Sequence, residues 1–316
     1  MCGASSAFGG KDVIRKGYAE AILSFGNDHA LTAGGRGGPG SLRSIALMHA
    51  SDMTFRIPPR ARTSHGAAYV DVGHGEPVVL IHGVGLRLEA WAPQIESLAV
   101  SHRVIAVDLP GHGSSSPIGG GSGLAEFVEW FTTTLDDLGL DSANVTGHSM
   151  GALIAGGCAV TAPERVRRVA LLSAVHRRDR AAASAVRARA AEIAAGKLDP
   201  IAPLSRWFGD ECVTSEPYLL VKNWLTSVDI EAYATAYGAF AEGDDLYAAR
   251  WPGVACPALL LTGELDPNST PQMSRDLAAA ASLADACIIA GHRHMVNLTA
   301  PDEVTTALRH WLARKV

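Results

Sequence analysis

Two patterns of hydrophobic and polar positions alternate along this chain from residue 66 onward. Continuous apolar runs of strand length occur in PVVLIHG, HRVIAVDLPG, ANVTGHS, VRRVALLSAV, CPALLLTGELD and ADACIIAGHRH. Such runs are typical of strands that are buried on both faces of a parallel sheet. Helical patterns such as residues 124–138 separate most of them, and AAYVDV alternates like an edge strand. We therefore predict an α/β fold with a mainly parallel sheet covered by helices on both faces.

The stretch 176–252 interrupts this alternation because it contains no strand pattern. RAAASAVRARAAEIAAG indicates an Ala/Arg helix that ends at Gly196, and SEPYLLVKNWL and IEAYATAYGAFAEG indicate further helices. Tyr233, Tyr237 and Phe240 recur at helical spacing, which favours packing between helices over a cofactor site. We predict a helical cap over 176–252, inserted between core segments 53–175 and 253–316.

The first 52 residues differ in composition from the rest of the chain. They include the Gly/Pro-rich stretch LTAGGRGGPGSLRS, and they offer only a weak helical pattern. Met53 opens MTFRIPPRARTSHGAAYVDVGHGEPVVLIHG, which reads as the start of an enzyme domain. We expect residues 1–52 to be a disordered or non-native extension outside the core.

Composition and charge narrow the class of protein. The 316 residues are 47% hydrophobic and 19% charged, with a formal net charge of -5. These values indicate a globular chain without the basic excess of nucleic-acid-binding proteins. Neither an apolar run of membrane-spanning length nor a secretory signal is apparent. We expect a cytoplasmic protein whose partner is a small-molecule substrate, and the sequence leaves a homo-oligomer open.

The motif GHSMG, residues 147–151, stands between a predicted strand and a predicted helix of small residues. In that context the pattern GxSxG is typical of a nucleophile elbow, a strained turn that lifts the serine hydroxyl above the sheet edge. A serine hydroxyl becomes a nucleophile only when a base takes its proton and a third group orients that base. Ser149 is therefore the candidate nucleophile.

Two later predicted strands each end in residues that are candidates for the acid and the base. One strand ends in Glu264 and Asp266, and the next ends in His292 and His294. The chain order of serine, acid and histidine is the order found on this type of sheet. The spacing alone leaves both carboxylates and both histidines open.

These motifs together resemble the α/β-hydrolase superfamily over residues 54–316. LIHGVG is similar to its oxyanion loop, DLPGHGSS to the loop after the next strand, TGELDPNS to its acid turn and GHRHMVNLTAPDEV to its histidine loop. The resemblance implies Asp266 as the acid rather than Glu264, and His294 as the base rather than His292. It also implies that His82 braces the oxyanion loop.

The resemblance further implies an oxyanion hole made by the backbone N–H groups of Val84 and Met150. Preorganised backbone donors of this kind stabilise the charge that develops during acyl transfer. After the histidine loop, Thr299 and Asp302 predict a capping box for the last helix, with Pro301 in its first turn.

Neither a cofactor nor a metal is predicted. GVGLRL lacks the third glycine of a dinucleotide fingerprint at Leu88, and GHGSSS lacks the lysine of a phosphate-binding loop. The HExxH spacing of zinc enzymes is missing. The five scattered cysteines never show CxxC spacing, so they indicate neither a disulfide framework nor a zinc site.

The sequence leaves the substrate open because the cap would select it. Arg177, in SAVHRRDR, could hold a substrate carboxylate, although a solvated loop is the competing interpretation. Trp224, like Trp91 and Trp207, could line an apolar pocket or pack within the protein. We expect a carboxylesterase-like serine hydrolase that forms an acyl-enzyme. The alternatives are a C–C bond hydrolase or enol-lactonase of aromatic catabolism, and a ligand-binding protein that retains a slow triad.

Overall fold

The computed structural model describes residues 57–197, 199 and 201–316. The chain divides into two units, Met1–Thr54 and Phe55–Val316. The predicted extension over residues 1–52 lies outside the described residues.

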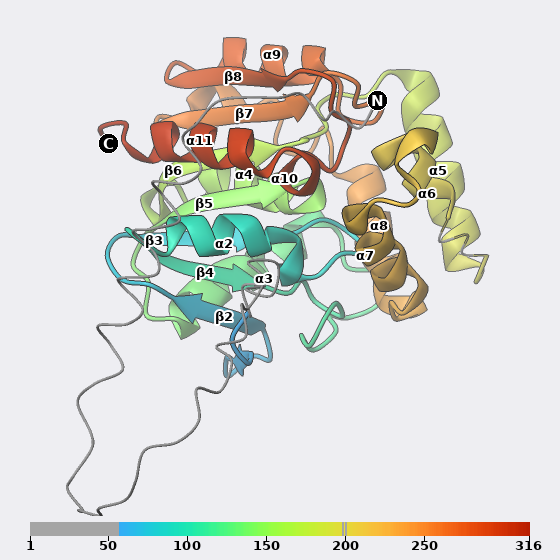
Figure 1. The fold of residues 1–316 in the computed structure, drawn as a ribbon, viewed down its shortest axis with the longest axis horizontal. Coiled ribbons are helices and arrows are strands. Elements are labelled where there is room, and N and C mark those ends of the chain that lie inside the picture. Colours follow the sequence, from blue (N-terminus) through green and yellow to red (C-terminus); the bar gives the residue numbers. More distant parts are fainter. Residues whose placement is uncertain (1–56, 198, 200) are drawn as a thin grey trace, which may run out of the picture. The chain divides into compact units, whose positions relative to one another are not determined.

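A mostly parallel sheet runs through the second unit, which confirms the predicted fold class (Figure 1). Its strand order is β1-β2-β4-β3-β5-β6-β7-β8. The pairs β1–β2 and β2–β4 are antiparallel, and the pairs from β4 through β8 are parallel. The strands are β1 (Ala61–Arg62), β2 (Ala68–Val72), β3 (Pro77–Ile81), β4 (Arg103–Val107), β5 (Ala143–His148), β6 (Val166–Leu172), β7 (Ala258–Gly263) and β8 (Ala284–Ile289).

Helices cover both faces of this sheet (Figure 1). One face carries α2 (Ala92–Leu98), α10 (Val296–Thr299) and α11 (Pro301–Leu312), and the other carries α3 (Leu124–Asp137), α4 (Met150–Thr161) and α9 (Pro271–Ala280). Each layer encloses its own buried apolar cluster. Because the central strands are buried on both faces, their apolar runs are continuous rather than alternating.

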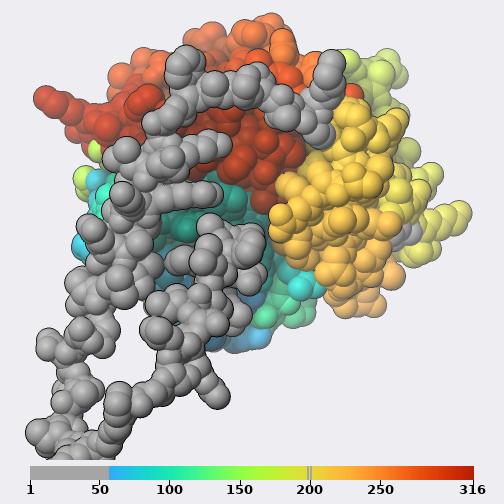
Figure 2. Space-filling model, in the orientation of Figure 1, coloured from blue at the N-terminus to red at the C-terminus, as the bar shows by residue number. Residues whose placement is uncertain are grey.

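Among the described residues, four α-helices lie between β6 and β7 in the chain, beyond the carboxyl ends of the parallel strands (Figure 1). They are α5 (Arg180–Ala194), α6 (Ala202–Phe208), α7 (Glu216–Thr226) and α8 (Ile230–Glu242). We call this segment the cap. Figure 2 shows its yellow and orange residues as one continuous surface beside the red C-terminal helices. The sequence pattern did not predict α6, whose seven residues are too few to display helical periodicity.

The start of α11 differs from its predicted capping box. Ala300 is the N-cap residue, and no side chain caps the helix there. Thr299 instead donates from Oγ1 to the carbonyl oxygen of Met295, and it lies 2.9 Å from His292 Nδ1. Thr299 is the last residue of the short helix α10, and its hydroxyl bonds back within that helix and not to the start of α11.

Candidate active site

Ser149 occupies a sharp turn between β5 and α4. Its backbone lies at φ 55°, a conformation that non-glycine residues rarely adopt and that costs free energy. A Cβ atom on Gly147 would overlap the carbonyl oxygen of Gly151, and one on Gly151 would overlap that of Ile81. Only glycines therefore fit two residues before and two residues after the strained serine, as the elbow motif predicts.

A buried hydrogen bond joins His294 to Asp266. The His294 Nδ1 atom lies 2.7 Å from Asp266 Oδ2, and both side chains are almost fully buried. The other carboxylate oxygen, Oδ1, accepts from the N–H groups of Asn268 and Ser269. Burial by itself would raise the pKa of Asp266, but the contacts with His294 and these two N–H groups together hold that pKa below its ordinary value. An ionised Asp266 keeps the proton on Nδ1 and leaves Nε2 of His294 as the basic nitrogen.

Two buried side chains fix the backbone of His294. The His294 carbonyl oxygen accepts from His148 Nε2 at 2.9 Å and from Ser173 Oγ at 3.1 Å. Ser173 is itself strained, with φ 48°, and its own carbonyl accepts from Ser269 Oγ at 2.6 Å. The loops that carry the base and the acid are thereby tied to the ends of β5 and β6.

The other carboxylate and histidine have structural contacts. Glu264 accepts from the N–H of Gly291 at 2.9 Å, and so anchors the turn before His294. His292 contacts the Thr299 hydroxyl. The hydrogen-bonding geometry thus favours Asp266 and His294 as the paired acid and base.

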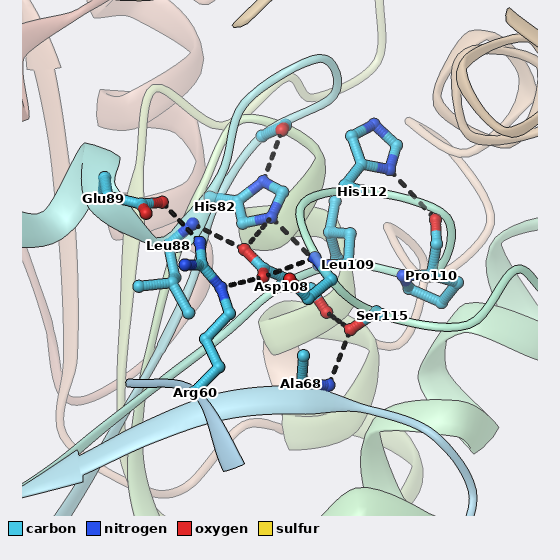
Figure 3. Close-up of polar contacts among 12 residues, drawn as sticks. Arg60, Ala68, His82, Leu88, Glu89, Asp108, Leu109, Pro110, His112 and Ser115 are labelled. Carbon is cyan, nitrogen blue, oxygen red and sulfur yellow. Dashed lines mark hydrogen bonds and ion pairs between the residues drawn. The ribbon is translucent and has the colours of Figure 1, made fainter. Parts of the chain in front are cut away.

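A network of buried polar groups holds the loop 82–88 that carries Val84 (Figure 3). Asp108 is fully buried, and it accepts from Leu88 N–H at 2.9 Å and from Arg60 Nε at 2.6 Å. The N–H of Leu109 donates to His82 Nε2 at 2.9 Å, so the His82 proton lies on Nδ1 and is donated to the Gly83 carbonyl at 2.7 Å. Burial lowers the pKa of His82 to about 3, so the His82 ring stays neutral and keeps its single proton on Nδ1.

A cavity of about 370 Å³ lies between this edge of the sheet and the cap. Ser149, His294 and Val84 line it from the core. Trp207, from α6, also lines it and stacks on the His294 ring with 5.6 Å between centroids. The cap contributes apolar and aromatic side chains together with the charged residues Arg178, Arg189, Glu192, Lys197, Asp199 and Arg206. The cavity has the size and the mixed lining of a small-molecule site.

Comparison with known proteins agrees with this architecture. A family model described as alpha/beta hydrolase fold matches residues 76–301. The chain belongs to the alpha/beta hydrolase family. A curated relative, the (E)-2-((N-methylformamido)methylene)succinate hydrolase of Acinetobacter baylyi, is 46% identical over 251 residues, which are 79% of this chain and 94% of the relative. With hydrolases as its relatives, this family member is an enzyme.

Solved structures of other family members share the fold. The enol-lactonase from Burkholderia xenovorans LB400 has a TM-score of 0.73 at 27% identity, covering 81% of this chain and 100% of that one. A thermophilic esterase from Thermogutta terrifontis, with malate bound, also has a TM-score of 0.73 at 26% identity, over 81% and 98% of the two chains. No helix among the described residues of this hydrolase has the length and apolar character needed to cross a membrane.

Two residues that sequence reasoning offered as substrate contacts lie away from the cavity of this hydrolase. Arg177 has φ 44°, and its exposed side chain is directed to Asp245 at 3.4 Å, while the next residue, Arg178, lines the cavity. Trp224 is buried within the cap and is not part of the cavity lining. Trp207, and not Trp224, is the tryptophan that lines the cavity.

Sequence reasoning missed Arg189 and Arg206 as cavity residues. Arg189 lies in the Ala/Arg-rich helix α5, and Arg206 lies in the short helix α6. Neither sequence pattern indicates which face of its helix lines the cavity. The sequence feature that could have indicated these cavity residues is the high number of arginines over residues 177–206.

Proposed function

We propose that this enzyme is a serine hydrolase that cleaves an acyl bond through a covalent acyl-enzyme. Ser149 attacks the substrate carbonyl, and His294 Nε2 takes its proton and returns it to the leaving group. Asp266 holds the required tautomer of His294. The N–H groups of Val84 and Met150 bind the oxyanion, and water then releases the acyl group.

The observation that carries this proposal is the buried 2.7 Å contact between His294 Nδ1 and Asp266 Oδ2, where His294 also lines the cavity beside the strained Ser149. The N–H of Met150 lies in the first turn of α4, where backbone N–H groups have no partner within the helix and carry partial positive charge. This position supports the proposal of a nucleophile and an anion-binding donor next to each other at the elbow.

A fluorophosphonate probe tests the nucleophile directly, because it reacts with activated serines. We expect one adduct per chain, located on Ser149 by peptide mass spectrometry. Ser173 and Ser269 provide internal controls, since both are buried and neither lines the cavity. The absence of an adduct, or an adduct on any other serine, would contradict the assignment.

We infer further that the acyl substrate carries at least one carboxylate. Arg206 is half-buried at the cavity wall, and its Nε has no hydrogen-bond partner among the described residues. The second arginine, Arg189, donates from Nη1 to the Tyr237 hydroxyl at 3.1 Å. Burial, and the neighbouring charge of Arg189, lower the pKa of Arg206, yet a guanidinium stays protonated. An anionic substrate group would supply the missing partner.

The relative from A. baylyi adds support for this substrate class, because its name describes a substituted succinate. Arg178 Nη2 likewise has no described hydrogen-bond partner, but Arg178 is a weaker candidate because its Nη1 already pairs with Asp244 at 3.0 Å. Arg206, with Arg189 beside it, is therefore the preferred carboxylate contact.

Replacing Arg206 with glutamine is expected to raise KM for mono-p-nitrophenyl succinate about 10- to 100-fold, the usual effect of losing a charge-assisted hydrogen bond. The kcat/KM for p-nitrophenyl butyrate, which lacks the carboxylate, should change less than about threefold. Initial rates on both esters measure this difference. Arg187→Gln is the matched control, because Arg187 is another arginine of the cap, on α5, that pairs with Glu242 and does not line the cavity. Equal losses on both esters would refute carboxylate recognition by Arg206.

Enol-lactone hydrolysis is a second candidate, favoured by the structural likeness to the B. xenovorans enol-lactonase. The same triad and cavity would serve that reaction. A kcat/KM for an enol-lactone well above that for the succinate ester would favour this candidate over an open-chain substrate.

A further inference from the structure

Val84 lies between two peptide groups that are each held by a buried histidine. The first joins Gly83 to Val84, and its carbonyl oxygen accepts from His82 Nδ1 at 2.7 Å and from Leu86 N–H at 3.2 Å. Because a trans peptide is planar, its C=O and N–H point in opposite directions. Fixing the Gly83 carbonyl therefore fixes the direction of the Val84 N–H.

The second peptide group joins Val84 to Gly85. Its N–H donates to His112 Nε2 at 3.0 Å (Gly85 N to His112 Nε2), and His112 Nδ1 in turn donates to the carbonyl of Pro110 at 3.0 Å. Figure 3 shows His112 beside His82, with its ring directed to Pro110. His112 is 2% exposed and is not part of the cavity lining, so it contacts the loop and not the substrate.

This second peptide group needs an external partner because Gly85 is conformationally free. Gly85 has φ 76°, which only glycine adopts readily, and glycine also has many other accessible conformations. A Cβ atom at Gly85 would lie 2.5 Å from Leu225 and 2.8 Å from Tyr233, so the cap packs directly on this turn. Without the bond to His112, nothing else among the described contacts holds the Gly85 N–H.

Burial keeps His112 in the form that this contact requires. The titratable groups around its ring are His82, Asp108, Arg87 and Asp229, and burial is the largest influence and lowers the pKa of His112. A neutral ring with its proton on Nδ1 leaves Nε2 as an acceptor for an N–H donor.

We propose that His112 is a positioning residue of the oxyanion loop, whose Nε2 accepts the Gly85 N–H and thereby holds the Val84 amide where negative charge develops. The inference rests on the proposed acyl-transfer mechanism and extends it from the loop to the turn after β4. His82 and His112 then hold the two peptide groups on either side of Val84.

His112→Leu removes the acceptor while keeping an apolar side chain. We expect kcat for p-nitrophenyl acetate to fall about 10- to 100-fold, somewhat less than the loss of an oxyanion donor itself, with KM changed less than about threefold. Affinity for a phenylboronic acid, which places a charged oxygen in the oxyanion hole, should fall in parallel. His112→Gln, which retains an acceptor, should recover most of both losses.

All rates are normalised to the number of sites that react with a fluorophosphonate, so misfolded protein does not contribute. His310→Leu, at an exposed position of α11, is the matched control and should behave like the wild type. An unchanged kcat per reactive site in His112→Leu, even with a lower melting temperature, would overturn the proposal and leave His112 purely structural. Failure of the proposed function would look different, because Ser149 would then not react with the probe in the wild type.

Discussion

Ser149→Ala is expected to lower kcat for p-nitrophenyl acetate by about 10⁴- to 10⁶-fold, to the level supported by binding and the oxyanion hole alone. The large effect follows because no other hydroxyl occupies the turn that faces His294. The fold should tolerate the change, since the backbone of Ser149, and not its hydroxyl, makes the local bonds. Its N–H donates to Leu172, and its carbonyl accepts from Ala152 and Leu153.

Initial rates and thermal melts on the same preparations measure both expectations. Ser274→Ala is the matched control: Ser274 is also a buried serine, its Oγ has no described hydrogen-bond partner, and it does not line the cavity. It should retain wild-type rates. Activity of Ser149→Ala within about tenfold of the wild type would rule out a serine nucleophile at the elbow.

The elbow and the sheet were predictable from the sequence because their signals are local. GHSMG needs glycines at residues 147 and 151, since a Cβ at 147 would meet the backbone at the start of α4 and a Cβ at 151 would meet the end of β3, and this requirement is visible in five adjacent residues. Continuous apolar runs likewise report burial on both faces of a strand. The order of Ser149, Asp266 and His294 along the chain then follows from the order of the strands that carry them.

The cap was predictable as helices but not as a binding surface. Which side of α5 or α6 faces the cavity depends on how these helices pack against the core, and no spacing within the sequence encodes that. The single-residue difference between Arg177 and Arg178 shows the problem: the positive φ of Arg177 directs one side chain to solvent and the next to the cavity. The contact between His112 and Gly85 spans 27 residues, so it too is set by tertiary structure.

The choice between the two carboxylates gives the most discriminating remaining test. In Asp266→Asn we expect kcat to fall by about 10⁴-fold, because the substitution reverses the tautomer of His294. The N–H groups of Asn268 and Ser269 point at Oδ1 of residue 266, so an asparagine would place its oxygen there and its NH₂ group toward His294 Nδ1. His294 would then accept at Nδ1 and carry its proton on Nε2, where it cannot take the proton of Ser149.

Glu264→Gln is the matched control for this substitution, because it makes the same chemical change two residues away. Glutamine keeps an oxygen for the Gly291 N–H, so the histidine loop should stay anchored and kcat should fall less than about threefold. Rates on p-nitrophenyl acetate, normalised to fluorophosphonate-reactive sites, compare the two variants directly. A larger loss in Glu264→Gln than in Asp266→Asn would make Glu264 the acid, and would require His294 to be oriented by a group other than the one 2.7 Å from its Nδ1.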